Sequence, residues 1–106
     1  AVASGDPEVC WRLGEAMAAQ GEVAEAEAQL AAARSGFETL LSRHLLAFAD
    51  HGAEFYASSG NDAHKAFALA RVNVENRPTR RAAEQMDSIA SLVPSSFTPR
   101  ANGVPG

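Results

Sequence analysis

The chain has 106 residues, of which 46% are hydrophobic and 21% charged, so its composition is that of one globular domain and argues against wholesale disorder. The single cysteine excludes an internal disulfide and a cysteine-based zinc site, and no segment has the roughly 20 apolar residues of a membrane span. The net charge of −4 and the shortness of the densest basic run, 77–81, argue against a nucleic-acid binder.

Five helices are predicted, and the first three occupy the N-terminal 59 residues. The first spans 7–20, because Asp6 is a good N-cap before a proline and Gly21 is a suitable left-handed C-cap. The second spans 22–43 and is rich in alanine, the best helix former. The third spans 45–59 and ends in a Ser-Ser-Gly sequence.

Two further helices are predicted after the Ser-Ser-Gly break. The fourth spans 61–76, with Asn61 or Asp62 as its N-cap, and ends before Pro78 because proline disfavours helical backbone at the preceding residue. The fifth helix is predicted at 79–92, with Thr79 as its N-cap. The fold class is therefore all-α, and abundant alanine with few aromatic residues supports it.

The helices form one domain, residues 7–92, between a short leader or linker at 1–6 and a tail at 93–106. The tail is rich in serine, proline, glycine and asparagine, so we expect it to be flexible. The chain begins without methionine, which suggests a processed product or an excised fragment. We expect a soluble chain without a signal peptide, and its compartment, cytoplasmic or periplasmic, stays open.

Helical spacing also predicts the core. The expected core residues are Leu13, Met17, Ala26, Leu30, Phe48, Tyr56, Ala66 and Met86. Cys10 is expected to be a small buried residue rather than a reactive thiol.

A pattern of small and apolar residues repeats after about 39 residues. The first copy consists of Leu13, Gly14, Met17, Gly21, Ala26, Leu30 and Ala33, and the second of Gly52, Ala53, Tyr56, Gly60, Ala66, Ala70 and Asn73. Small residues at Gly14 and Ala53 would let two helices approach closely, and glycines at 21 and 60 would close the turns. Each helix pair then leaves an apolar face that a neighbouring pair covers.

This repeat resembles the tetratricopeptide repeat family over residues 7–92. Cys10 stands at the family's usual tryptophan position, whereas the longer second helix and Asn73 depart from the family pattern. The resemblance implies antiparallel hairpins stacked as a short right-handed solenoid, two hairpins plus a capping helix, from a longer bacterial repeat protein.

The resemblance also implies a binding groove, lined by the first helix of each pair. The corresponding positions are Glu8, Trp11, Glu15, Ala18 and Ala19 in the first copy and Ala47, Asp50, Glu54, Ala57 and Ser58 in the second. Trp11 would be an aromatic anchor, with Glu15, Asp50 and Glu54 selecting a peptide that carries Lys or Arg. In the alternative, Trp11 packs against the N-terminal segment or a preceding repeat, and the acids only solvate the surface.

Motifs of enzymes and cofactor sites are absent, so no catalytic residue, cofactor or metal is predicted. His44 and His51 lie seven residues apart on one helix face, too far to chelate one metal alone. His51 with Asp50 and Glu54 would form a weak site only if a neighbour contributed. Asn73 is expected to hydrogen-bond backbone near Pro78.

The resemblance implies a non-catalytic protein-protein interaction module whose partner is a protein or peptide of basic character, whereas composition and periodicity support only the helical hairpins. One alternative is an architectural segment that packs against adjacent repeats or a second copy of itself. Another is an accessory domain of an enzyme whose catalytic domain lies outside these residues.

Overall fold

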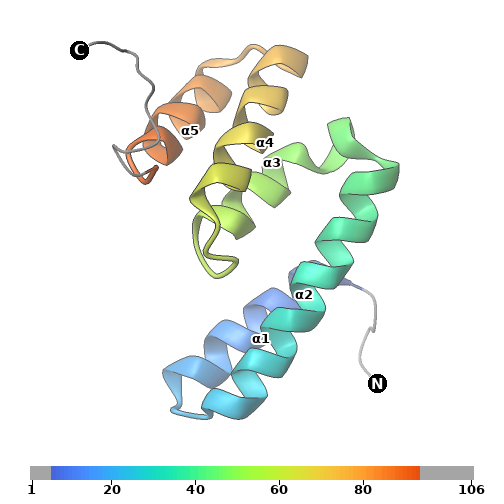
Figure 1. The fold of residues 1–106 in the computed structure, drawn as a ribbon, viewed down its shortest axis with the longest axis vertical. Helices are drawn as coiled ribbons and strands as arrows, with labels where there is room; N and C mark the ends of the chain where they lie inside the picture. Colours follow the sequence, from blue (N-terminus) through green and yellow to red (C-terminus); the bar gives the residue numbers. More distant parts are fainter. Residues whose placement is uncertain (1–5, 94–106) are drawn as a thin grey trace, which may run out of the picture.

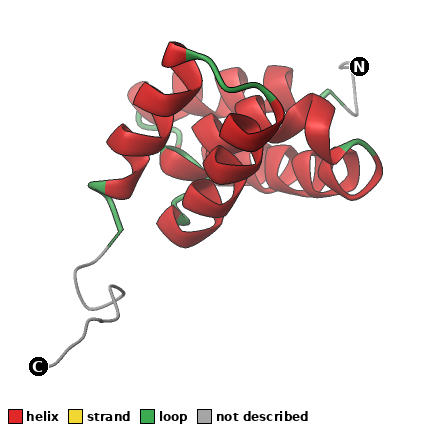
Figure 2. Cartoon of the chain, turned by 90° about the horizontal axis from the view of Figure 1, so that it is seen from above, coloured by secondary structure: helices red, strands yellow, loops and turns green. Residues whose placement is uncertain are grey.

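The computed structural model describes residues 6–93. Over this range the chain folds into five helices without any strand, as Figures 1 and 2 show. They are α1 (Pro7–Ala19), α2 (Val23–Arg43), α3 (Leu45–Ala57), α4 (Ala63–Asn76) and α5 (Arg80–Ala90). All five predicted helices are confirmed, with ends within two residues of the predicted bounds. The expected leader and tail lie outside the described residues, except for Asp6 and Val93.

Three helices begin with a side-chain cap. The Asp6 carboxylate accepts hydrogen bonds from two backbone N–H groups in the first turn of α1, at 3.0 and 3.4 Å. Asp62 and Thr79 do the same for α4 and α5, each at 3.1 Å. These caps satisfy N–H groups that have no partner inside the helix. Arg77, in extended backbone before Pro78, ends α4 as predicted.

The two hairpin turns differ in their left-handed residue. Gly21 closes the α1–α2 turn with φ +84°, a conformation that glycine adopts without a steric penalty. In the α3–α4 turn the left-handed residue is Asn61, with φ 52°, and not Gly60. Gly60 nevertheless takes part in closing this turn, as predicted: its N–H donates to the Phe55 carbonyl oxygen at 2.7 Å, and a Cβ atom there would lie 2.8 Å from the Phe55 ring. Asparagine tolerates the left-handed conformation better than most residues.

The helices form two antiparallel pairs and one added helix. α1 packs along the first half of α2, and the far half of α2 reaches α3, as Figure 1 shows. α3 packs against α4, and α5 packs against α4 while its side chains also reach α3. The molecule is consequently elongated, with extents of 52 × 29 × 22 Å.

Gly14 allows the close approach of α1 and α2. A Cβ atom at this position would lie 2.8 Å from the Leu30 side chain and 3.2 Å from the Ala26 carbonyl oxygen. Both distances are shorter than ordinary carbon contacts. The predicted reason for a small residue at position 14 is thus confirmed.

An aromatic cluster forms the centre of the core. Phe37, Phe55 and Tyr56 are the largest fully buried side chains, and Trp11 joins them. Of the predicted core residues, three are buried: Ala26, Tyr56 and Ala66. Three are half-buried and pack against the core, namely Leu30, Phe48 and Met86, and Met17 is half-buried. Cys10 is buried, as expected.

The prediction of Leu13 as a core residue is wrong. Its side chain is 39% exposed, and Val9, one turn earlier, is 43% exposed. α1 directs Trp11 toward α3 and Gly14 toward α2, so a residue between them in sequence points away from both neighbours at 100° per residue. Helical spacing identified an apolar position but not which face the other helices cover.

Candidate functional site

Trp11 lies in the core and not on an exposed groove. The residue is only 4% exposed. Its ring meets those of Phe55 and Phe37 edge-on, with centroid distances of 5.4 and 6.1 Å. The predicted role of Trp11 as an exposed anchor is therefore corrected, because its indole fills the space between α1, α2 and α3.

The polar edge of the indole joins α1 to the end of α3. The Trp11 Nε1–H donates to Glu15 Oε2 at 2.8 Å and, at 3.1 Å, to Ser59 Oγ. The Ser59 hydroxyl itself donates to the same Glu15 oxygen at 2.8 Å. These bonds, from Ser59 first, lower the pKa of Glu15. Glu15 is thus held between two helices by internal donors.

Arg12 covers the outer face of this assembly. Its guanidinium carbon stands 4.0 Å from the centre of the Trp11 ring, a cation-π geometry. The same guanidinium pairs with Glu8 at 3.0 Å and with Glu15 at 3.3 Å. The first-copy groove positions therefore form a closed network in this structure.

The second-copy carboxylate Asp50 joins α3 to α5. Asp50 accepts hydrogen bonds from Arg81 at 2.9 Å and from the Gln85 amide at 2.8 Å. Burial alone would raise the pKa of Asp50, but the hydrogen bonds from Arg81 and Gln85 outweigh it and lower that pKa.

Gln85 has more acceptors than hydrogens to share. Its Nε2 lies 2.8 Å from both Asp50 Oδ1 and Glu54 Oε2, and 3.4 Å from the Asp50 backbone oxygen. An amide nitrogen carries two hydrogens, so these acceptors share them. Two carboxylates therefore converge on one neutral group.

Asn73 supports Gln85 from α4. Its Nδ2 donates to Gln85 Oε1 at 3.3 Å, and both residues are buried. The expected partner, backbone near Pro78, is not the one observed, so that prediction is corrected. At the end of α4, the Arg77 N–H donates to the Asn73 backbone carbonyl oxygen at 2.7 Å, while the Asn73 side chain bonds to Gln85.

A cleft of about 360 Å³ opens between α3 and α5 beside this polar cluster. Its lining residues are Glu54, Ala57, Arg81, Glu84, Gln85, Ser88, Ile89 and Leu92. Two carboxylates thus share the cleft with apolar side chains. Sequence reasoning predicted Glu54 and Ala57 as groove positions but missed the whole α5 side. The available signal was Gln85, a polar residue in helical register with the apolar Ala82 and Ile89.

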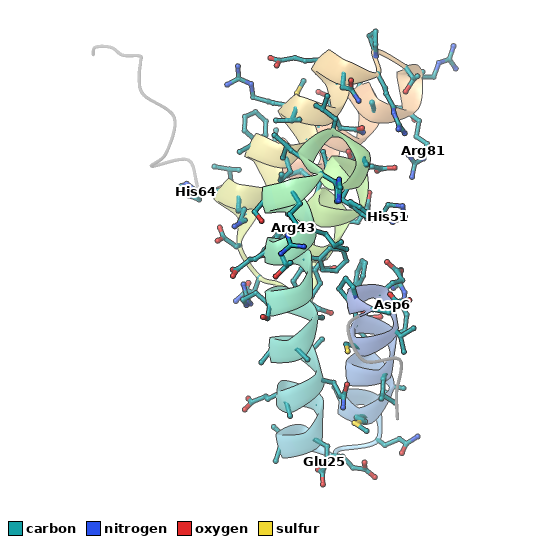
Figure 3. The ribbon with its side chains drawn as sticks, turned by 90° about the vertical axis from the view of Figure 1, so that its right-hand side faces the viewer. Asp6, Glu25, Arg43, His51, His64 and Arg81 are labelled. Carbon is teal, nitrogen blue, oxygen red and sulfur yellow. The ribbon has the colours of Figure 1, made fainter. Side chains whose placement is uncertain are left out.

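A second cavity of about 160 Å³ lies where α1 begins, between α2 and α3. It is lined by Asp6, Pro7, Glu8, Phe37, Leu40, Phe48 and His51. In Figure 3, Asp6, His51 and Arg81 follow one another along one side of the molecule, whereas Glu25 lies at its far end. Arg81, from the first cleft, and Asp6 and His51, from the second cavity, therefore lie on the same side of the molecule.

The histidines do not gather into a metal site. His51 Nδ1 lies 3.8 Å from Glu8 Oε1, across the α1–α3 junction. Within residues 6–93 no group of three or more His, Cys, Asp or Glu side chains could hold a metal ion. His44 does not cap α3 with its side chain, and its ring lies tilted at 56° to that of Phe48, with 6.3 Å between ring centres.

Comparison of the chain with known protein families, with curated proteins and with solved structures yields no match. Among the helices described here, none combines the length and the apolar character that crossing a bilayer requires.

Proposed function

We propose that this protein is a non-catalytic interaction module that binds a peptide or protein segment at the cleft between α3 and α5. The observation that carries the proposal is the cleft itself. It combines the Glu54 and Glu84 carboxylates with apolar surface from Ile89 and Leu92. Apolar contacts supply affinity in such sites, while charges steer and select the partner.

We also propose that the helices are tetratricopeptide-like hairpins with α5 as a capping helix. Two features support this. Close α1–α2 packing at Gly14 uses a small residue where the repeat pattern has one. Side chains also join each first helix to the next, α1 to α3 through Trp11 and α3 to α5 through Asp50.

The groove in this proposal differs from the one predicted from the sequence. Trp11 and Glu15 belong to the internal α1–α3 contact, so they support the fold beside the site. Asp50 holds α5 in place. Glu54, which is exposed, is the predicted groove residue that faces the ligand.

A peptide array followed by solution titration tests the function. We expect the chain to capture peptides that carry basic and aliphatic residues, with Glu54→Lys weakening binding by about fivefold or more through charge reversal. Glu25→Lys is the matched control, because Glu25 lies at the far end of the molecule (Figure 3) and should leave binding unchanged. Absence of any captured peptide would overturn the proposal.

A second candidate function, a self-associating architectural segment, rests on a different surface. Val9 and Leu13 are exposed on one face of α1, and Val23 is exposed at the start of α2. Val9 and Leu13 are four residues apart and so share one face of α1, and exposed apolar residues grouped on one face are typical of interfaces. The solution mass distinguishes the two: a dimer that dissociates in Leu13→Glu and captures no peptide favours this candidate.

A further inference from the structure

We infer that the partner segment is recognised at two points across α3: an apolar side chain in the cavity at the start of α1, and an arginine or lysine in the α3–α5 cleft about four residues away. This inference rests on the proposed function and names the chemistry of its ligand. α3 lines both cavities, the first through Phe48 and His51 and the second through Glu54 and Ala57.

The first point is suited to one apolar side chain. Pro7, Phe37, Leu40 and Phe48 form the walls, and the cavity measures about 160 Å³. An apolar cavity of about 150 Å³ accommodates a benzene-sized group. A leucine or phenylalanine side chain therefore matches its size.

The second point carries more negative than positive charge. Arg81 lines the cleft, but its guanidinium is paired with Asp50 at 2.9 Å. Glu54 accepts from the neutral Gln85 amide at 2.8 Å and shares the charge of Arg81 with Asp50. Glu84 adds another carboxylate to the cleft lining. A guanidinium or ammonium group entering the cleft would give Glu54 a charged donor, and charge-assisted hydrogen bonds are the stronger kind.

The aliphatic part of the basic side chain has a matching surface. Ala57, Ile89 and Leu92 line the same cleft, and the stems of lysine and arginine pack on apolar surface while their charged ends reach polar groups. The apolar residues distinguish this cleft from a purely acidic surface. Such a surface would attract any cation but would give the aliphatic part of lysine or arginine nothing to pack against.

The spacing of the two points follows from helix geometry. Phe48 and Glu54, and likewise His51 and Ala57, are six residues apart, which is about 9 Å along the axis. Six residues also turn a helix through about 600°, so the side chains of each pair point about 120° apart, which adds about 9 Å across a helix about 10 Å wide. The resulting distance of about 13 Å corresponds to about four residues of extended chain, which places both side chains on one face of the peptide.

The test uses fluorescent glycine-serine peptides that carry one leucine and one arginine, separated by about two, four or eight positions. Fluorescence anisotropy with the whole chain should show the tightest binding at about four. Replacing the peptide's leucine with alanine should weaken binding about tenfold, because a buried apolar side chain is lost. Replacing its arginine with glutamine should weaken binding about fivefold.

Variants of the protein assign each point. Glu54→Gln should remove the preference for arginine over glutamine in the peptide and keep the preference for leucine over alanine. Leu40→Phe, which narrows the cavity at the start of α1, should remove the preference for leucine over alanine in the peptide and keep the preference for arginine over glutamine. Glu25→Gln is the control for Glu54→Gln, and thermal unfolding followed by circular dichroism verifies that each variant is folded.

The outcomes separate this inference from the proposed function. Peptides that bind with equal affinity at every spacing, or that respond to neither Glu54→Gln nor Leu40→Phe, would overturn two-point recognition and leave an interaction module. If none of these peptides binds but other array peptides do, the inference also fails and the function stands. If nothing binds at all, both fail.

Discussion

The α1–α3 and α3–α5 junctions, which would stand at equivalent places in the proposed repeat, are built from opposite chemistry. At the first, Trp11 meets Phe55, the eleventh residue of α3. At the second, Asp50, which occupies the place of Trp11, meets Arg81 and Gln85, the second and sixth residues of α5. α5 is therefore shifted along its neighbour relative to the first junction.

The difference shows that one helix junction can be filled as part of the core while the next leaves a cleft at the surface. Aromatic rings fill the first junction, and their edges fit together at 75–81°. Polar side chains bridge the second junction but do not fill it, and a cleft of about 360 Å³ remains. Hydrogen bonds hold their donor and acceptor atoms at set distances and angles. Polar side chains that bridge two helices therefore leave more space between them than close-packed rings do.

Removing Trp11 gives the strongest test of the contrast. Trp11→Ala should cost about 3–5 kcal/mol of unfolding free energy, because it empties a buried space among three helices. Urea unfolding followed by circular dichroism measures this loss. Trp11→Phe keeps a ring but loses the N–H donor, so its unfolding free energy should lie between those of Trp11→Ala and the original chain. A cost below about 1 kcal/mol would mean that the first junction does not depend on its aromatic filling.

The corresponding change at the polar junction should cost less. Gln85→Ala leaves the Asn73 amide and Asp50 each without one partner, so we expect a loss of about 1–3 kcal/mol. Glu84→Ala, on the exposed side of the same helix, is the control and should be close to neutral. If Gln85→Ala destabilised the chain more than Trp11→Ala, the ranking of the two junctions would be reversed.

Acid should weaken both junctions through Glu15 and Asp50. The pKa of each carboxyl is lowered in the folded chain, so the folded state binds protons less readily than the unfolded chain. Their stabilisation is complete above the unfolded pKa values and declines as the pH falls through the folded ones. The unfolding temperature should therefore decrease below about pH 4.5, and Glu15→Gln should make that decrease smaller.

Tyr56→Phe should have the smallest effect. The Tyr56 hydroxyl is buried and makes no hydrogen bond of ordinary geometry among the described residues, and burial together with the nearby Glu38 carboxylate raises the pKa of this phenol. Deleting an unpaired buried hydroxyl removes a desolvation cost, so we expect unchanged stability or a gain of up to about 1 kcal/mol. Calorimetry would contradict this if the variant lost more than about 1 kcal/mol.

Local signals were sufficient to predict the helices. Asp6, Asp62 and Thr79 cap α1, α4 and α5, and a cap depends only on its neighbours in sequence. Pro78 separates α4 from α5 for the same reason. Leu13 shows the limit of this information, because its burial depends on which helices lie beside α1.

The candidate site was predicted only in part. Asp50 and Glu54 were identified as groove positions, and both take part in the α3–α5 polar cluster. The α5 residues could not be deduced, since the shift of α5 along α3 changes which side chains face one another. Trp11 was misplaced because a tryptophan on a helix suits an exposed groove and a buried junction equally well.

The length of α2 has a consequence for how the protein opens. Its 21 residues begin beside α1 alone, pass the shared aromatic cluster at Ala33 and Phe37, and end at α3. Amide hydrogen exchange should therefore be slowest in the middle of α2 and fastest at its first turns, near Val23. Residues of α1 and of the α3–α4 pair both pack against that middle section. Local unfolding of one pair therefore exposes core residues of the other, and the two pairs unfold as one cooperative unit.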